Sequence, residues 1–215
     1  MDKSVIRFSH CGRDIYCFSI PEQCPECGLG LGGRRLEEAP VSMPNPFSNG
    51  HKAFCSFLVA PTEGHFRGEF DGESELHTGI TDTAGVVYNY TKTGVRRDVE
   101  GWEKCISIPL VQPDMYNLIS QWDQYLEKFS STHTWDTQWQ RFDEETHNCY
   151  SYTLMFINCV LATQGKRSLS KDEFTNSFVL PRMKRASKYS ALCEEVSKNG
   201  FYIVESPQKD PEGCS

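Results

Sequence analysis

The sequence lacks long apolar runs and has no excess of positive charge. Its first residues, MDKSVIRFSHC, hold no apolar stretch of signal-peptide length, and no later segment approaches the length that crosses a membrane. Lys and Arg number 22 against 29 Asp and Glu, a formal net charge of −7, whereas binding to nucleic acid requires a basic stripe. We therefore expect a cytoplasmic or nuclear protein with no transmembrane segment and no nucleic-acid partner.

Cysteine, by contrast, is abundant, with ten among 215 residues. In a reducing compartment these cysteines are expected to be thiols, metal ligands or a nucleophile rather than a disulfide framework. Residues 1–28 are cysteine-dense, and the Gly and Pro runs of 29–51 are typical of a linker. Residues 52–205 have the pattern of a packed domain, and the polar residues 206–215 are expected to form a disordered tail.

The packed domain is predicted to be α+β, with an antiparallel sheet packed on a central apolar helix. Apolar and β-branched runs predict strands, helical spacing predicts helices, and Asp114 is expected to cap the first of these helices. The predicted strands are 53–60, 75–82, 85–90, 104–111 and 201–205, and the predicted helices are 115–129, 149–162, one that follows the capping box at 170–173, and one that ends at Gly200.

The central helix begins with a cysteine. Its segment, NCYSYTLMFINCVLA, is apolar on every side, so the helix should be buried. Thr146 or Asn148 can cap its start, which leaves Cys149 in the first turn, where the helix dipole favours a thiolate. A nucleophilic cysteine needs a histidine nearby to take its proton. The alternative interpretation is that Cys149 is a small buried hydrophobe.

Among six histidines, His77 is the candidate base. It opens the predicted strand LHTGITD, where a sheet can hold the ring rigidly, and Gly79 on the same strand face leaves room beside it. His147 is closer in sequence to Cys149, but side chains two apart do not face each other on a helix. In the alternative interpretation His77 is an ordinary hydrogen-bonded polar residue.

The phrases LHTGITDTAGVVYNY and THNCYSY together resemble the circularly permuted branch of the papain-like folds. This branch contains the NlpC/P60 superfamily with its PPPDE-type and lecithin-retinol-acyltransferase-like relatives, in which a strand histidine precedes the cysteine of the core helix. The resemblance covers residues 76–161. Over essentially its full length the chain also resembles the makorin opposite-strand family, whose name describes a gene's position and gives no activity.

The resemblance implies that Cys149 is the nucleophile and His77 its base in a thiol hydrolase or acyltransferase. The reaction would pass through a thioester on a peptide, isopeptide or lipid acyl substrate and would need no cofactor. No second histidine follows on the next strand, as it does in the acyltransferase-like relatives, so Asn89 or Asp82 is expected to orient the ring. The hairpin register that decides between these two is not fixed by the sequence.

The alternative function is that of a catalytically inactive papain-like scaffold that serves as a protein-binding adaptor. It would bind a protein partner through the N-terminal segment or through a groove beside the Trp-rich segment. Trp135 and Trp139, four residues apart, are the candidate lining of such a groove, although packing in the core is the alternative for both.

The N-terminal segment HCGRDIYCFSIPEQCPECG offers a separate chemistry. Cys24 and Cys27 form a CxxC knuckle, and a tetrahedral zinc site needs two further ligands. Cys11 is well placed, and Cys17 or His10 can be the fourth. We predict a structural zinc in a zinc-ribbon-like finger, with the ligands Cys11, Cys17, Cys24 and Cys27. Alternatively, Cys17 packs in a core strand and the others are reduced thiols. A redox role is not expected, because the CxxC runs into glycines instead of opening a helix.

Overall fold

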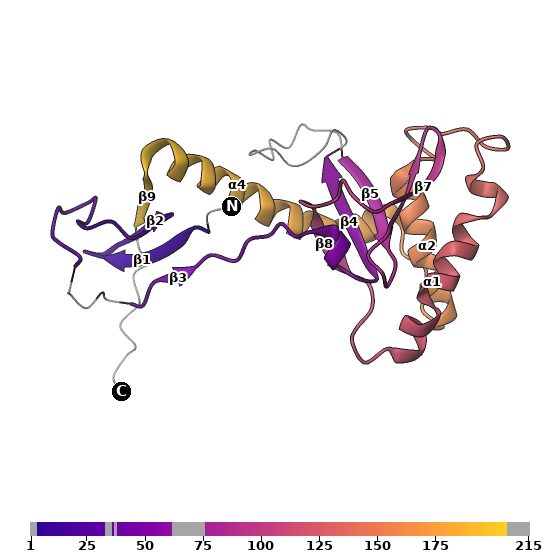
Figure 1. The fold of residues 1–215 in the computed structure, drawn as a ribbon, viewed down its shortest axis with the longest axis horizontal. Helices are drawn as coiled ribbons and strands as arrows, with labels where there is room; N and C mark the ends of the chain where they lie inside the picture. Colours follow the sequence, from indigo (N-terminus) through magenta and orange to yellow (C-terminus); the bar gives the residue numbers. More distant parts are fainter. Residues whose placement is uncertain (1–3, 33–35, 37, 62–75, 206–215) are drawn as a thin grey trace. The chain divides into compact units, whose positions relative to one another are not determined.

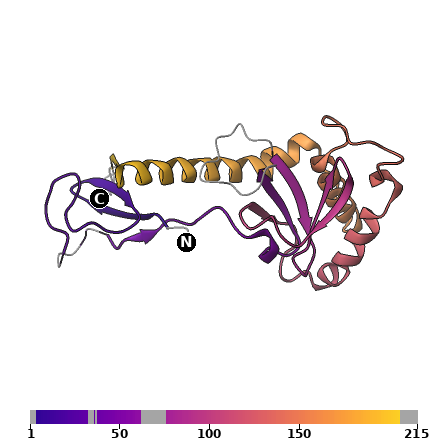
Figure 2. The ribbon, with the colours of Figure 1, turned by 45° about the horizontal axis from the view of Figure 1, so that its top comes forward.

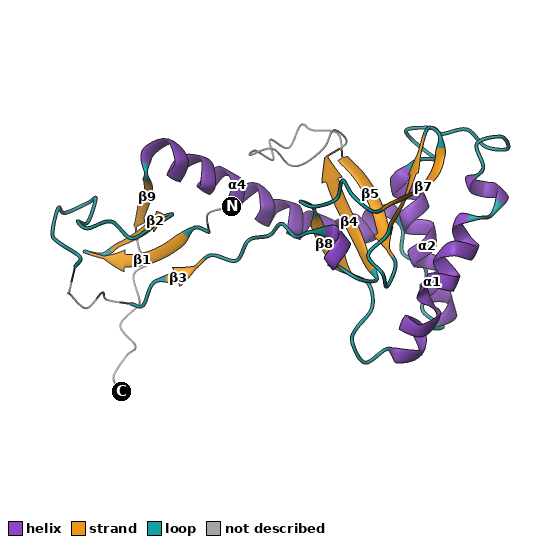
Figure 3. Cartoon of the chain, viewed as in Figure 1, coloured by secondary structure: helices purple, strands orange, loops and turns teal. Residues whose placement is uncertain are grey.

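The fold is mixed α and β, with antiparallel sheets, in a computed structural model that describes residues 4–32, 36, 38–61 and 76–205 (Figure 1). This confirms the α+β class predicted from the strand and helix patterns. The chain divides into two compact units. We refer to Pro46–Ser187 as the central unit and to Met1–Asn45 together with Lys188–Ser215 as the N-terminal unit. Figure 3 distinguishes the helices and strands of each unit.

The central unit contains a five-stranded antiparallel sheet of order β7-β6-β5-β4-β8. Its strands are β4 (Ser56–Pro61), β5 (Leu76–Thr81), β6 (Val87–Thr91), β7 (Gly94–Asp98) and β8 (Ile106–Pro109). In the hairpin of β5 and β6, Gly79 pairs with Asn89 and Ile80 with Tyr88. Side chains alternate between the two faces of a strand, so this register decides which residues can meet His77.

Two helices cover one face of this sheet, α1 (Tyr116–Ser130) and α2 (Cys149–Thr163), and both views show them on the same side (Figures 1 and 2). Phe156 and Tyr152 of α2 and Trp122 of α1 are fully buried and share one core with Phe57 and Tyr90 of the sheet. The helix that the sequence predicts to be apolar on all sides therefore lies centrally, because both the sheet and α1 need apolar partners.

The remaining elements of the central unit are short. They comprise the 3-10 turns Gly50–Lys52 and His133–Trp135, α3 (Lys171–Phe174), and a π-helical turn, Thr175–Val179, that leads into α4 (Leu180–Asn199). Ser170 and Glu173 form the predicted capping box at the start of α3. The cap predicted at Asp114 is wrong, because the residue at the start of α1 is Met115, with no side-chain cap.

The N-terminal unit contains a second antiparallel sheet, of order β3-β1-β2-β9. Its strands are β1 (Ile6–His10), β2 (Arg13–Cys17), β3 (Val41–Ser42) and β9 (Phe201–Glu205). The boundaries therefore differ from those expected from the sequence, since β9 pairs with β2 instead of joining the domain 52–205. β3 lies in the segment 29–51 that we interpreted as a linker. The expected tail, 206–215, lies outside the described residues.

Candidate functional site

Cys149 is the first residue of α2, and a complete capping box fixes its position. The Asn148 side chain accepts hydrogen bonds from the backbone N–H groups of Tyr150 and Ser151, each at 3.0 Å, and the Ser151 hydroxyl accepts one from the Asn148 N–H at 2.7 Å. Of the two caps that the sequence allows, Asn148 is the one that forms. It holds the first turn of α2, and with it the Cys149 thiol, in a fixed place.

His77 is the second residue of β5, and its side chain projects from the sheet face that carries Trp102. On this face its ring packs against Trp102, with 5.7 Å between ring centroids. Its neighbour Thr78 points to the other face, where its hydroxyl lies 3.4 Å from that of Thr153 on α2. Gly79 shares the His77 face, and a Cβ there would lie 3.2 Å from the Trp102 ring. The glycine therefore leaves the space in which Trp102 packs beside His77.

The Cys149 thiol and the His77 imidazole lie near enough for each group to shift the pKa of the other. Burial acts to raise the pKa of Cys149, but the contact with His77 and hydrogen bonds from Thr78 lower it below the ordinary value of a thiol. Burial acts to lower the pKa of His77, and the contacts with Cys149 and Asn89 raise it. The two shifts have opposite signs, and both favour a thiolate–imidazolium pair over the neutral groups.

Asn89 occupies the other side of the His77 ring. Its Oδ1 lies 2.9 Å from Nε2 of His77, and the amide is 1% exposed. An amide oxygen only accepts hydrogen bonds, so Nε2 carries a proton and donates it to Asn89. Nδ1 is therefore the ring nitrogen left for the Cys149 thiol. Of the two candidates for orienting the ring, Asn89 does so, whereas Asp82 accepts backbone hydrogen bonds from Ala84 and Val86 in the β5–β6 turn.

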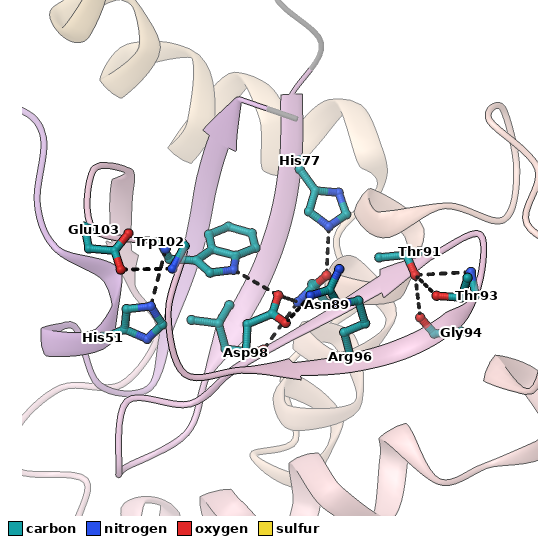
Figure 4. Close-up of polar contacts among 12 residues, drawn as sticks. His51, His77, Asn89, Thr91, Thr93, Gly94, Arg96, Asp98, Trp102 and Glu103 are labelled. Carbon is teal, nitrogen blue, oxygen red and sulfur yellow. Dashed lines mark hydrogen bonds and ion pairs between the residues drawn. The ribbon is translucent and has the colours of Figure 1, made fainter. Parts of the chain in front are cut away.

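Asp98 fixes the orientation of the Asn89 amide, and His77, Asn89 and Asp98 form one hydrogen-bonded row (Figure 4). The Asn89 Nδ2 group donates to Asp98 Oδ2 at 2.7 Å, and the Trp102 indole N–H donates to the same oxygen at 3.3 Å. A carboxylate only accepts hydrogen bonds, so it attracts the NH₂ side of the amide and turns the oxygen toward His77. Arg96 pairs with the other Asp98 oxygen at 3.1 Å.

The other described histidines of the central unit have structural contacts. His51 Nδ1 lies 2.8 Å from the Gly85 carbonyl, and its Nε2 accepts from the Trp102 N–H at 3.4 Å. His147 is 5% exposed and stacks on Trp135, with 4.7 Å between ring centroids. Trp135 is buried in the core while Trp139 is 74% exposed, so the two do not line a common groove.

A second cluster of reactive side chains lies in the N-terminal unit. The ligating atoms of His10, Cys11, Cys24 and Cys27 all lie within 4.8 Å of one another, so this group could hold a metal ion. Of the two candidates for the fourth ligand, the structure brings His10 to the other three and not Cys17. Cys17 is 2% exposed, and its thiol faces the Ile6 carbonyl at 3.9 Å.

Strand geometry explains why Cys17 is absent from this cluster. The cluster lies at the turn between β1 and β2, where His10 pairs with Arg13, whereas Cys17 lies at the opposite end of the hairpin and pairs with Ile6. Four residues of extended chain, about 13 Å, separate Arg13 from Cys17. The alternative interpretation, in which Cys17 packs in a core strand, is the one that this geometry supports.

Comparison with known proteins shows where the chain belongs. The family model described as DUF4796 C-terminal matches residues 40–196, and DUF4796 N-terminal matches residues 3–31. The chain belongs to the DUF4796 family. This DUF4796 chain is 53% identical to the human MKRN2 opposite strand protein over 214 residues, which cover 98% of the chain and 95% of that protein. The match confirms the full-length resemblance seen in the sequence. No solved structure matches the chain.

Three residues of the DUF4796 site are missing from the sequence-based prediction, namely Thr78, Asp98 and Trp102. Thr78 adjoins the histidine, but a threonine in a strand carries no signal of its own. Asp98 ends the segment GVRRD, whose charged residues are not typical of a strand, and Trp102 lies in the loop that follows. Once the register of the β6–β7 hairpin is known, Asp98 can be identified as a polar residue on the same sheet face as Asn89.

Proposed function

We propose that this DUF4796 protein is a thiol hydrolase or acyltransferase in which Cys149 is the nucleophile and His77 the base. The observation that carries the proposal is a thiol at the start of α2 whose pKa is lowered by an imidazole, together with the bond that holds Nε2 of this imidazole on Asn89. This arrangement of nucleophile, base and orienting group is the pattern expected of nucleophilic catalysis. The central unit would then be a permuted papain-like scaffold.

The proposed reaction has two steps. The Cys149 thiolate attacks the carbonyl carbon of an acyl donor, the imidazolium of His77 gives its proton to the leaving group, and a thioester forms on the sulfur. His77 then takes a proton from water, or from an acceptor alcohol or amine, and the oxygen or nitrogen of that molecule attacks the thioester. The C–S bond breaks, the acyl product leaves, and the sulfur departs as a thiolate beside the His77 imidazolium, which restores the starting pair.

The supporting residues have distinct parts in this scheme. Asp98 holds the Asn89 amide so that its oxygen accepts from Nε2, which keeps Nδ1 directed to the thiol. Thr78 donates to the sulfur and so favours the thiolate. Trp102 covers the His77 ring and limits the access of water to the row of hydrogen bonds.

An oxyanion formed in either step would lie near the start of α2, where backbone N–H groups and the helix dipole favour negative charge. The N–H groups of Tyr150 and Ser151 are already bonded to the Asn148 side chain. The backbone N–H of Cys149 itself is therefore the candidate donor from this turn. The acyl donor belongs to the peptide, isopeptide or lipid class.

Acylation by an activated ester tests this proposal. The purified chain is mixed with a p-nitrophenyl ester, the reaction is quenched in acid, and the acylated cysteine is located by mass spectrometry. We expect an acyl group on Cys149 that hydroxylamine removes. His77→Ala should slow its formation by about 10²-fold or more, the usual contribution of a general base.

Cys159 supplies the matched internal control, because it lies on the same helix and is exposed. Burial by its neighbours raises the pKa of Cys159, and no histidine shares in its shift. The enzyme proposal is refuted if Cys149 is acylated no faster than Cys159, or if the wild-type chain and His77→Ala react at equal rates. Either result would favour the inactive, protein-binding scaffold.

A further inference from the structure

The CxxC knuckle takes no part in the proposed thiol chemistry, yet its two cysteines meet two further donors at the tip of the β1–β2 hairpin. We infer that His10, Cys11, Cys24 and Cys27 form a closed site for one Zn²⁺ ion, which joins the hairpin to the knuckle. The inference does not depend on the reactivity of Cys149, because all four residues belong to the other compact unit of the chain.

Two of the six distances between the donor atoms belong to direct contacts, and both fit a tetrahedron around zinc, while all six lie within 4.8 Å. With Zn–S bonds of about 2.3 Å and a Zn–N bond of about 2.05 Å, the edges of a tetrahedron are about 3.8 Å between two sulfurs and about 3.6 Å between sulfur and nitrogen. The Cys11 and Cys24 sulfurs lie 3.8 Å apart, and the Cys27 sulfur lies 3.5 Å from Nδ1 of His10. Both edges agree with a zinc polyhedron and are far longer than an S–S bond of about 2.05 Å.

The hairpin turn is shaped to present Cys11. His10 and Arg13 close the hairpin, so Cys11 and Gly12 are its two central residues, and both have positive φ, 47° and 73°. Such two-residue turns favour Asn or Gly at these places, and a cysteine there is unusual. A thiol that binds a metal ion accounts for the left-handed backbone at Cys11, because this backbone directs the Cys11 sulfur toward Cys24.

The knuckle is shaped in a complementary way. Gln23 and Gly30 form a β-bridge, the Gly28 N–H donates to the Cys24 carbonyl at 2.8 Å, and Gly28 has a φ of 73°. The Cys24 N–H donates to the Leu29 carbonyl, also at 2.8 Å, so both backbone groups of Cys24 are held within this tight loop. These bonds orient Cys24 as a metal ligand, as the outer hydrogen bonds of metal sites do.

The donor set decides both the metal and its role. Three thiolates and one imidazole select zinc among common divalent ions, and four protein ligands leave no open position for a substrate. The N-terminal unit has a small core, whose buried members are Phe8, Ile15, Cys17, Cys24 and Leu31. A core of this size gives a unit little stability of its own, so the ion would act as a structural link between hairpin and knuckle.

Metal analysis of the full chain tests the site. We expect the chain, purified without chelator and dialysed, to contain one zinc per molecule by atomic emission spectroscopy. Replacement by Co²⁺ should give the strong visible bands of a tetrahedral ion with thiolate charge-transfer absorption. Cys27→Ser should reduce the bound zinc at least tenfold, and because Cys27 is exposed this variant loses no core packing.

Cys17→Ala is the matched control, because it removes a neighbouring cysteine outside the cluster and should retain one zinc. Melting of both proteins with and without a zinc chelator gives an independent readout. The chelator should lower the melting temperature of the wild-type chain and of Cys17→Ala, and leave that of Cys27→Ser unchanged. The inference is overturned by a wild-type chain with less than a tenth of an equivalent of zinc and no tetrahedral Co²⁺ spectrum, or by a Cys11–Cys24 disulfide in the native protein.

Discussion

Replacing Gly79 by alanine should damage both the stability of the central unit and the candidate site. Gly79 pairs with Asn89 in the sheet and lies beside Trp102. A Cβ at this position would lie 2.6 Å from Val87 Cγ1, 3.1 Å from the Tyr88 carbonyl oxygen and 3.2 Å from the Trp102 ring. Val87 is fully buried and β-branched, so it has no free rotamer into which to move.

The expected magnitude follows from two opposing terms. Overpacking of one methyl group in a closed site costs about 1–3 kcal/mol. Alanine in place of glycine within a strand regains about 0.5–1 kcal/mol through the lower entropy of the unfolded chain. Taken at the middle of their ranges, the two terms leave a net loss of about 1 kcal/mol, which for a chain of this length lowers the melting temperature by about 2–4 °C.

Urea unfolding, followed by tryptophan fluorescence, measures the loss of stability, and the alkylation rate of Cys149 reports the site. Because the new methyl group pushes on Trp102, which packs on His77, alkylation of Cys149 should also slow. Gly32→Ala is the control, since a Cβ at Gly32 would have no neighbour within 4 Å. If Gly79→Ala unfolds at the same urea concentration as Gly32→Ala, the packing of Trp102 against β5 described above is wrong.

Three further changes test other parts of the structure. Asn148→Ala removes the capping box of α2 and should cost about 1 kcal/mol in urea unfolding, and an unchanged midpoint would contradict the cap. Arg97 and two neighbouring hydroxyl groups lower the pKa of Glu127 from 4.5 to about 2, so its carboxylate stabilises the fold above pH 4.5 and progressively less as the pH falls toward 2. Glu127→Gln should therefore flatten the loss of stability in that window, and an identical acid limb in urea midpoints measured against pH would refute the Arg97 pairing. Asp98→Asn removes a charge that raises the pKa of His77, so an NMR titration should find that pKa lowered, and an unchanged value would exclude Asp98 from the row.

Local patterns in the sequence predict much of the central unit. The apolar run after Asn148 predicts α2, and alternating residues predict the hairpin that holds His77 and Asn89. These features depend on periodicity and on caps a few residues apart, which the sequence carries directly. The prediction that Cys149 and His77 meet has a different basis, namely the resemblance to the permuted papain-like branch, because spacing alone does not bring a helix start to a strand start.

The features that the sequence did not predict depend on pairings between distant segments. The pairing of β9 with β2 joins Phe201 to Cys17, and no local pattern indicates which sheet a terminal strand will enter. The charged β7 forms a strand because β6 offers it an edge, and only then does Asp98 reach Asn89. The choice between His10 and Cys17 depends on hairpin register, which a turn of two residues decides.

The pH dependence of Cys149 alkylation tests the central claim most directly. Each cysteine is followed by mass spectrometry during reaction with iodoacetamide between about pH 5 and pH 10. This range spans the ordinary pKa values of histidine and cysteine. An unperturbed thiol is only about 3% ionised at pH 7, so full ionisation can raise its rate by at most about 30-fold.

If His77 activates Cys149, the alkylation rate of Cys149 should rise with pH earlier than that of Cys159 on the same helix, and should exceed it at pH 7. In His77→Ala the burial of Cys149 remains without its partner, so its midpoint should move above that of an ordinary thiol. A Cys149 profile that coincides with that of Cys159, or that His77→Ala leaves in place, would contradict the account.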